Sequence, residues 1–140
     1  MGLNNRWMAA FLKDIGDAFP ELRREINPIV GRHGPSGLAL LPVLHHLQRM
    51  VAHGDTVPLA QMVALLERYY CPDDERLKPF NDRVEQFIFD SLTFHCRGGR
   101  ASWLVFTPKL RRAYRRWITE GLGFPWRNFA PYNSGDLPDG

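Results

Sequence analysis

The fold is decided by residues 56–95, which read TVPLAQMVALLERYYCPDDERLKPFNDRVEQFIFDSLTFH. Leu59 and Met62 begin a series of apolar residues spaced three and four apart, so these side chains gather on one face of a helix. Thr56 is suited to cap this helix, and Pro58 falls in its first turn, where a missing N–H costs little. The pattern predicts a helix that begins at Thr56 and buries one face.

A turn and a second helical pattern follow. The helix is expected to end at Cys71-Pro72-Asp73-Asp74, because proline disfavours the helical conformation of the residue before it and aspartate favours turns. A second helical period then runs from Phe80 to His95, with Asn81 or Asp82 near its start. Two one-sided helices joined by a short turn favour an antiparallel hairpin, and they need further helices to bury their apolar faces.

The residues before this stretch supply some of those helices. Asn4 or Asn5 is suited to cap a first helix whose apolar side chains continue to Phe19. Two further helical turns at 21–26 are expected to stop before Pro28, since proline clashes with the preceding turn of a helix.

A loop is expected at residues 31–37, which contain three glycines and one proline. The helix after it is expected to start near Leu40 or Leu41 and to end at His53, before Gly54. Its first turns are apolar nearly all round, so we expect it to be the most buried helix of the bundle.

The last third of the chain is less regular. Residues 101–106 form an apolar run that is too short to assign to a strand or a helix by its period. Thr107 and Pro108 repeat the capping pattern and open a helix that is expected to end at Gly121 or Gly123. Beyond it, aromatic side chains follow without a period. The first part of this tail is expected to pack on the core and the last few residues to fray.

Together these patterns predict an all-α fold, a single bundle of about five or six helices with an irregular aromatic C-terminal tail. The expected domain takes in residues 1–140, with its core at about 5–122 and its tail at 123–140. No run approaches the ~20 apolar residues of a membrane span, and the first residues lack the pattern of a secretory signal. We therefore expect a cytoplasmic protein that does not bind a membrane.

The sequence has no pattern typical of a metal site or a catalytic centre. His45 and His46 are adjacent and point about 100° apart on a helix, and Cys71 and Cys96 fit no zinc spacing. Ser36 lies among glycines without the strand, turn and helix of a nucleophile elbow. We expect no cofactor, no metal and no catalytic residue, and hence a protein that acts by binding.

Basic residues are concentrated near the C-terminal end. Residues 100–127 contain seven basic residues and one acidic residue, whereas residues 1–99 contain eleven basic and twelve acidic residues. A band able to meet phosphates or an acidic protein surface is expected along the last helix. It consists of Arg111, Arg112, Arg115 and Arg116. Alternatively, these arginines are solvated or pair with Glu85, Asp90 or Glu120.

Several short motifs follow one another in chain order. They are Phe19-Pro20-Glu21-Leu22, His53-Gly54-Asp55, Leu65-Leu66-Glu67-Arg68-Tyr69, Asp73-Asp74-Glu75, Phe87-Ile88-Phe89-Asp90-Ser91-Leu92 and Phe106-Thr107-Pro108-Lys109-Leu110, which leads into Trp117. Their order, over about residues 8–118, resembles that of small all-helical bacterial domains similar to the immunity proteins of polymorphic and contact-dependent toxin systems.

The resemblance implies a protein that neutralises a cognate toxin domain by stoichiometric binding, through a complementary charged and aromatic surface. The arginine band suits an acidic toxin, and an acidic set around the central turn suits a basic nuclease toxin. That acidic set consists of Glu67, Asp73, Asp74, Glu75, Asp82 and Glu85. The alternative is a nucleic-acid-binding or regulatory protein that uses the basic helix at 108–120.

Overall fold

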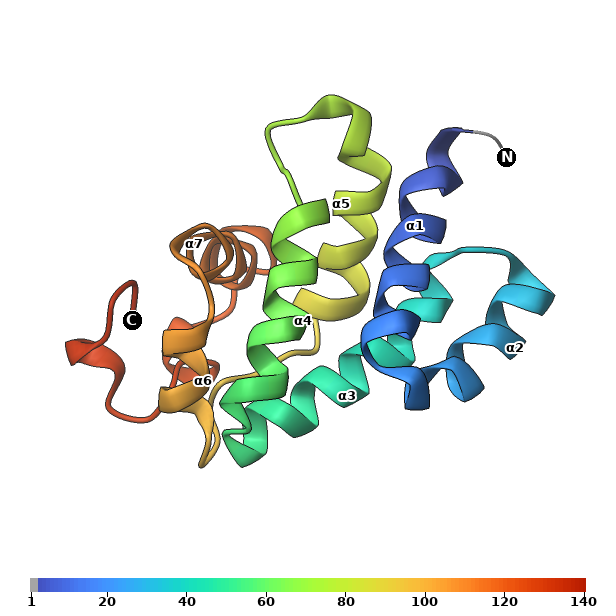
Figure 1. Ribbon diagram of the computed structural model, residues 1–140. Coiled ribbons are helices and arrows are strands. Elements are labelled where there is room, and N and C mark those ends of the chain that lie inside the picture. The colour runs from blue at the N-terminus through green and yellow to red at the C-terminus, as the bar shows by residue number, and fades with distance from the viewer. Residues whose placement is uncertain (1–2) are drawn as a thin grey trace.

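The computed structural model describes residues 3–140, with side chains from Arg6 onward, and the described chain is built from helices without a β-strand (Figure 1). Seven α-helices form the fold of residues 3–140, so the all-α prediction is confirmed. They are α1 (Leu3–Ala18), α2 (Arg23–His33), α3 (Leu40–His53), α4 (Thr56–Tyr69), α5 (Lys78–Val84), α6 (Gly99–Val105) and α7 (Pro108–Arg116). Two of them continue as π-helical turns, α5 into Glu85–Phe89 and α7 into Trp117–Gly121.

One hydrophobic core joins all seven helices, and α4 lies at its centre. α4 packs against α1, α3 and α6, and α1 also packs against α5. In Figure 1, α1 and α5 lie on one side of α4, and α6 and α7 lie on the other. Leu59, Met62 and Leu66 of α4 have no exposed surface. The apolar face predicted for this helix is therefore confirmed, and its burial holds the neighbouring helices together.

The predicted start of α4 at Thr56 is confirmed, but its cap differs from the sequence expectation. The N-cap residue of α4 is Asp55, with Thr56 already inside the helix, and neither cap position forms a side-chain capping hydrogen bond. The predicted cap at Thr56 is therefore wrong by one residue. The cap predicted at Asn4 or Asn5 concerns side chains that lie outside the described ones.

α2 is longer than the sequence predicts. The expected stop before Pro28 is wrong, because the helix continues through Pro28 to His33. Proline removes one helical hydrogen bond and crowds the preceding turn. Beyond it, Ile29 and Val30 pack against the hydrophobic core. Their burial offsets the local penalty, so tertiary packing decides the length of this helix.

The loop expected at 31–37 is shortened to 34–36 as a result. Gly34 ends α2 with a φ of 74° and donates its N–H to the carbonyl of Val30 at 2.8 Å. The predicted start of α3 at Leu40 is confirmed. So is its end before Gly54, which has the left-handed φ of 66° that glycine adopts without strain.

The helical period expected at 80–95 is displaced towards the N-terminus. The carboxylate of Asp74 accepts the backbone N–H two residues further on at 3.0 Å and starts a 3-10 turn that leads directly into α5. At the other end, helical structure closes with the π-helical turn, and residues 90–95 are irregular. Asn81 and Asp82 therefore lie inside the helix, which corrects their predicted place at its start.

Asn81 closes the turn between α4 and α5. Only 5% of its surface is exposed, and its side-chain amide meets the backbone of Cys71 twice. The N–H of Cys71 donates to Oδ1 at 3.1 Å, and Nδ2 donates to the carbonyl of Cys71 at 2.8 Å. This pair of bonds fixes the acidic turn between residues 71 and 81 relative to α5.

The run at 101–106, which the sequence left open, is helical up to Val105 as part of α6, and Phe106 is its extended C-cap. The cap predicted at Thr107 is confirmed, since its hydroxyl accepts the N–H of Leu110 at 3.3 Å. The helical residues after it end at Gly121, one of the two predicted stops.

We predict that Asn81→Ala lowers the free energy of unfolding by about 1–3 kcal/mol, because it leaves the part-buried N–H and carbonyl of Cys71 without their partner. Urea denaturation followed by circular dichroism measures the loss. Asp82→Ala is the matched control, since its pair with Lys78 is exposed and is expected to cost less than about 1 kcal/mol. Equal losses for the two variants would contradict the role assigned to Asn81.

Candidate functional site

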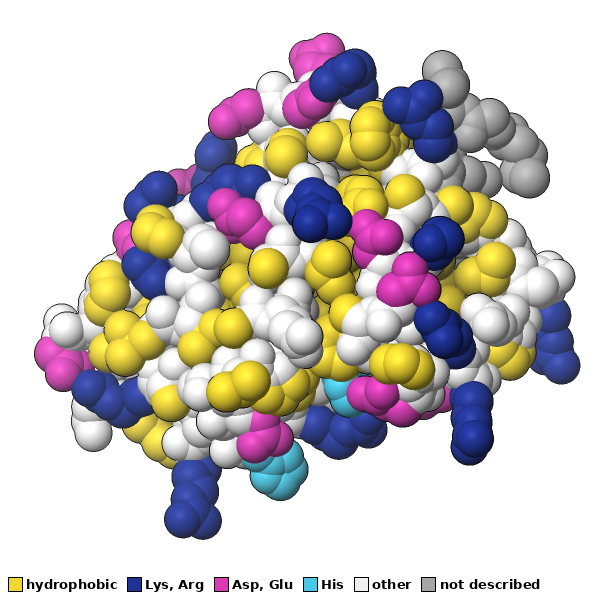
Figure 2. Space-filling model, in the orientation of Figure 1, with side chains coloured by type: hydrophobic (Ala, Val, Ile, Leu, Met, Phe, Trp, Pro, Cys, Tyr) yellow, Lys and Arg dark blue, Asp and Glu magenta, His cyan; other side chains and the backbone are white. Residues whose placement is uncertain are grey.

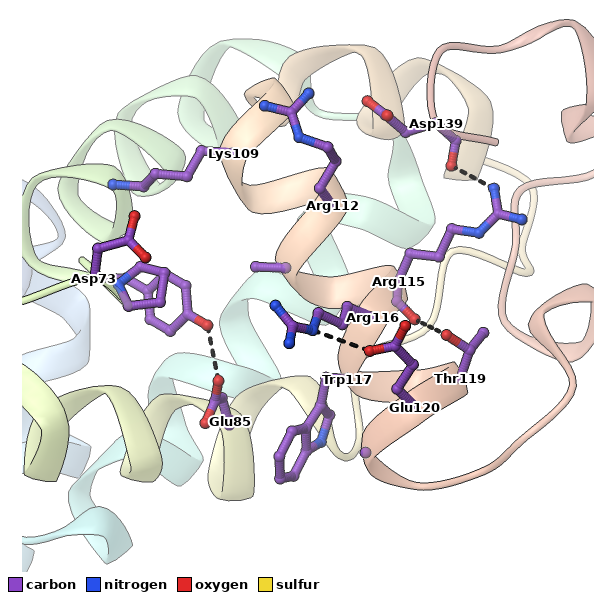
Figure 3. A pocket seen from close by; sticks show the side chains of 14 residues that line it. Asp73, Glu85, Lys109, Arg112, Arg115, Arg116, Trp117, Thr119, Glu120 and Asp139 are labelled. Atoms are coloured by element: carbon purple, nitrogen blue, oxygen red, sulfur yellow. Dashed lines mark hydrogen bonds and ion pairs between the residues drawn. The ribbon is translucent and has the colours of Figure 1, made fainter.

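A cleft of about 920 Å³ lies between the acidic turn and α7 (Figure 3). Its basic side chains are Lys109, Arg112, Arg115 and Arg116, its acidic side chains are Asp73, Glu85, Glu120 and Asp139, and its aromatic side chains include Tyr70 and Trp117. The wall on the α4 side comes from the end of that helix and from the turn after it. The opposite wall comes from α7 and its continuation.

Both π-helical turns contribute to the cleft. Glu85 begins the first, and the second supplies four lining residues from Trp117 to Gly121. A side chain at Gly121 would approach the Trp117 ring to 2.8 Å, so the indole needs a glycine at this position. The indole N–H of Trp117 donates to the carboxylate of Asp90 at 2.6 Å. Asp90, expected as a possible partner of an arginine, instead holds this tryptophan.

The structure brings together part of each predicted charged set. From the acidic set Asp73 and Glu85 line the cleft, and from the arginine band Arg112, Arg115 and Arg116 do so. The remaining predicted residues, which do not line it, are Glu67, Asp74, Glu75, Asp82 and Arg111. Figure 2 shows acidic side chains over the turn between α4 and α5 and basic side chains beside them over α7.

The two most exposed arginines of the cleft differ in their partners. Arg116 donates from Nε to Glu120 at 3.0 Å, so one of the pairings expected from the sequence is confirmed. Both side chains of this pair are more than two thirds exposed, and such pairs contribute at most about 1 kcal/mol. The guanidinium of Arg112 forms no hydrogen bond or ion pair with any described residue. Both arginines can therefore bind a ligand at little cost.

A part-buried hydrogen bond joins two lining residues on the α5 side of the cleft. The hydroxyl of Tyr70 donates to Oε2 of Glu85 at 2.9 Å. Burial raises the pKa of Glu85 above its ordinary value of 4.5, and burial together with the nearby carboxylate raises the pKa of Tyr70. Glu85 is therefore costly to keep ionised, and its first role is to hold Tyr70 in the cleft wall.

Arg111 does not belong to an open binding surface, which corrects the sequence expectation. It is 7% exposed, and its guanidinium donates to the carbonyl of Phe106 and, at 3.2 Å, to the carboxylate of Asp139. Arg115 donates to the backbone carbonyl of Asp139 at 3.0 Å and lies over the ring of Trp126, 5.1 Å from its centre. Half of the arginine band therefore binds the chain's own tail.

The end of the tail is held by the core, contrary to the expected fraying. Arg100 donates to both carboxylate oxygens of Asp136 at 3.0 and 2.9 Å. The indole N–H of Trp103 donates to the carbonyl of Pro138 at 2.7 Å, and that of Trp126 donates to the carbonyl of Gly140 at 2.7 Å. Nothing in the sequence period marks these contacts, because they join residues 14 to 36 positions apart.

Most side chains of the acidic set also form hydrogen bonds or ion pairs within the chain. Glu67 accepts from the hydroxyl of Thr107 and lies 3.8 Å from Nζ of Lys109, so it joins α4 to the start of α7. The other engaged members are Asp74, bound to Arg76 at 2.9 Å, and Asp82, bound to Lys78 at 3.3 Å. Asp73 and Glu75 are exposed, and neither forms an ion pair with a described residue.

Comparison of the chain with family models, curated proteins and solved structures found no match. Among the described helices, none combines the length and the apolar character that crossing a membrane requires. The cleft and its charges are therefore the basis on which function is inferred.

We predict that Asp139→Ala lowers the free energy of unfolding by about 1–3 kcal/mol, because it leaves the guanidinium of Arg111 buried without its carboxylate. Thermal and urea denaturation measure the loss. Asp136→Ala removes the carboxylate of an exposed pair and should cost less than about 1 kcal/mol. If the order of the two losses were reversed, Arg111 would not depend on the tail.

A second prediction concerns Glu85 and pH. Because the pKa of Glu85 is raised in the folded protein, the folded state binds this proton more tightly than the unfolded chain does. This contribution to stability is fully present below pH 4.5 and is lost as the pH rises through the folded pKa. Glu85→Gln keeps an acceptor for Tyr70 but cannot ionise. Its stability relative to the wild type should therefore increase as the pH rises through this window.

Urea denaturation at pH values on both sides of 4.5 tests this expectation. Glu120→Gln is the control, since this carboxylate lies in an exposed pair. A stability difference between the wild type and Glu85→Gln that is constant with pH would show that burial of Glu85 does not affect its ionisation.

Proposed function

We propose that this chain is a non-enzymatic binding protein that neutralises a bacterial toxin domain by covering it stoichiometrically, as immunity proteins do. The observation that best supports the proposal is the cleft itself. It joins Asp73 of the acidic turn to Arg112 and Arg116 of α7, around the aromatic rings of Tyr70 and Trp117. A cytoplasmic location and a protein partner are part of this proposal.

The residue types of the cleft suit a protein partner. Arginine, tryptophan and tyrosine are the side chains most enriched at the energetic centres of protein interfaces. Trp117 is already fixed by Asp90, so little side-chain entropy is lost when a partner covers it, and the buried Tyr70 supports the wall beneath. Exposed charges of both signs at the rim favour rapid association with a surface of complementary charge.

The mixed charge of the cleft favours neither of the two expected partner types by itself. Arg112 lies on one wall and Asp73 on the other, so neither a uniformly acidic nor a uniformly basic toxin surface matches the whole cleft. A partner surface that places a carboxylate against Arg112 and a cation against Asp73 satisfies both walls. We therefore propose a toxin surface with both signs of charge.

Nucleic-acid binding, the alternative, has weaker support. It needs several basic side chains that are free to meet phosphates, whereas Arg111 and Arg115, half of the arginine band, bind the tail. A nucleic-acid-binding protein would keep DNA or RNA through purification and release it as salt is raised. That outcome would replace the present proposal.

We predict that Arg112→Glu weakens binding to the cognate toxin domain by about 10- to 100-fold, because it places a carboxylate where the partner's own carboxylate binds. The toxin domain is sought in the reading frame directly upstream of this gene, and binding is measured by titration calorimetry. Arg24→Glu makes the same charge change on an exposed residue of α2, distant from the cleft, and should leave the affinity unchanged.

Growth assays give an independent test. Cells that express the toxin domain should survive when they also express the wild type or Arg24→Glu, and should survive less well with Arg112→Glu. A neighbouring product that is not toxic, or toxicity that the wild-type chain does not relieve, would contradict the proposed function.

A further inference from the structure

The tail segment 136–140, with the sequence Asp-Leu-Pro-Asp-Gly, is bound to the folded core in the manner of a peptide ligand. The donors that hold it come from α6, α7 and the short helix at Trp126–Asn128, and we call them the arginine–tryptophan surface. This surface consists of Arg100, Trp103, Arg111, Arg115 and Trp126.

Two carboxylates, three residues apart, supply the sequence-specific contacts. Asp136 meets the guanidinium of Arg100 through both of its oxygens, a bidentate arrangement that selects a carboxylate over a neutral acceptor. Asp139 meets Arg111, which is nearly buried. Between them, Leu137 packs against the hydrophobic core. The side chains that are recognised are therefore acidic, apolar and acidic in turn.

The remaining contacts are made to the backbone of the segment. The indole of Trp103, the guanidinium of Arg115 and the indole of Trp126 donate to three successive carbonyls, those of residues 138, 139 and 140. Backbone acceptors are common to every peptide, so these donors bind the segment, which turns between Leu137 and Gly140, without selecting its side chains. Backbone contacts for affinity and side-chain contacts for selection are the general pattern of peptide recognition.

We propose that the arginine–tryptophan surface is a binding site for an acidic protein segment with two carboxylates three residues apart. The chain's own segment 136–140 occupies this site, and an acidic segment of the partner protein replaces it in the complex. This inference rests on the proposed function only in that it takes the partner to be a protein.

The position of the site next to the cleft supports the replacement. Asp139 lines the cleft and also binds Arg111 and Arg115. When the tail segment leaves, Arg115, which already lines the cleft with Arg112 and Arg116, loses its partner on the tail. Arg111 is then free to join these three. All four arginines of the band then face one ligand, although in the free protein two of them are occupied by the tail.

The chain's own segment 136–140 competes with a free peptide for the site, so the affinity for a peptide has to be measured on a variant in which this competitor is weakened. A segment tethered to its own site competes with an effective concentration in the millimolar range. A free peptide with micromolar affinity therefore binds poorly to the wild type. Removing the two charges of the tail weakens the internal competitor while every donor of the site remains.

The experiment uses the full chain and the labelled peptide Ser-Gly-Asp-Leu-Pro-Asp-Gly, the sequence of residues 134–140. Fluorescence anisotropy should show that the double variant Asp136→Asn, Asp139→Asn binds this peptide at least about ten times more tightly than the wild type does. A peptide with asparagine in place of both aspartates should not bind. Added salt should weaken the binding, because both side-chain contacts are ionic.

A matched control distinguishes the loss of the tail's two carboxylates from a general change in the net charge of the chain. Glu25→Gln with Asp55→Asn removes two exposed carboxylates elsewhere on the chain and should bind the peptide no better than the wild type. Circular dichroism checks that each variant is folded. If the double variant does not fold, Asp136→Asn alone tests the proposal, since it disrupts only an exposed pair, and it should bind the peptide more tightly than the wild type.

The outcomes are distinct. A folded variant that fails to bind the peptide, or equal binding by the double variant and its control, would overturn the inference even if the toxin complex forms. Peptide binding without any complex with a toxin domain would contradict the proposed function and leave the acidic-segment site established.

Discussion

Burial of one face of α4 is the constraint on which the rest of the structure depends. Three helices cover this face, α1, α3 and α6, and they come from both halves of the chain. The opposite face of α4 is exposed, and the helix ends at Tyr69, where the buried ring of Tyr70 leads into the acidic turn beside α7. Asn81 fixes the turn that follows. The cleft thus forms where α4 ends. One wall comes from the end of α4 and the turn after it, and the other comes from α7.

The helical periods could be predicted from the sequence because a period of apolar residues reports burial directly. The face of α4 and the start of α3 follow this pattern. α2 does not, because its length is decided by the packing of residues after Pro28 against the core. The local penalty of a proline can be read from the sequence, but the packing that offsets it cannot. The shift of α5 has a similar cause. Asp74 starts the helical turns earlier than the apolar period does, since capping depends on a side-chain geometry that spacing alone does not specify.

The charged residues show a different limit. Sequence spacing correctly placed Arg112 and Arg116 on one side of a helix, and the acidic turn was recognised from its composition. The partner of Arg116 was predictable because it lies one helical turn away. The partner of Arg111 was not, because its ion pair with Asp139 joins residues 28 positions apart with no period between them. A charge is a local property of the sequence, whereas its neutralisation is a property of the fold. From the sequence alone, a band of four arginines resembles an open binding surface, although two of the four bind the tail in the folded protein.

Arg111 also limits the kind of partner that can displace the tail. A nearly buried guanidinium is stable only with an acceptor of opposite charge, and the tail supplies one in the free protein. A partner that removes the tail without offering a carboxylate would leave this charge uncompensated, and the complex would lose the stability that the tail had provided. A partner with a correctly placed carboxylate exchanges one ion pair for another at little net cost. The same buried arginine that stabilises the fold therefore discriminates among ligands by penalising those that lack an acidic group.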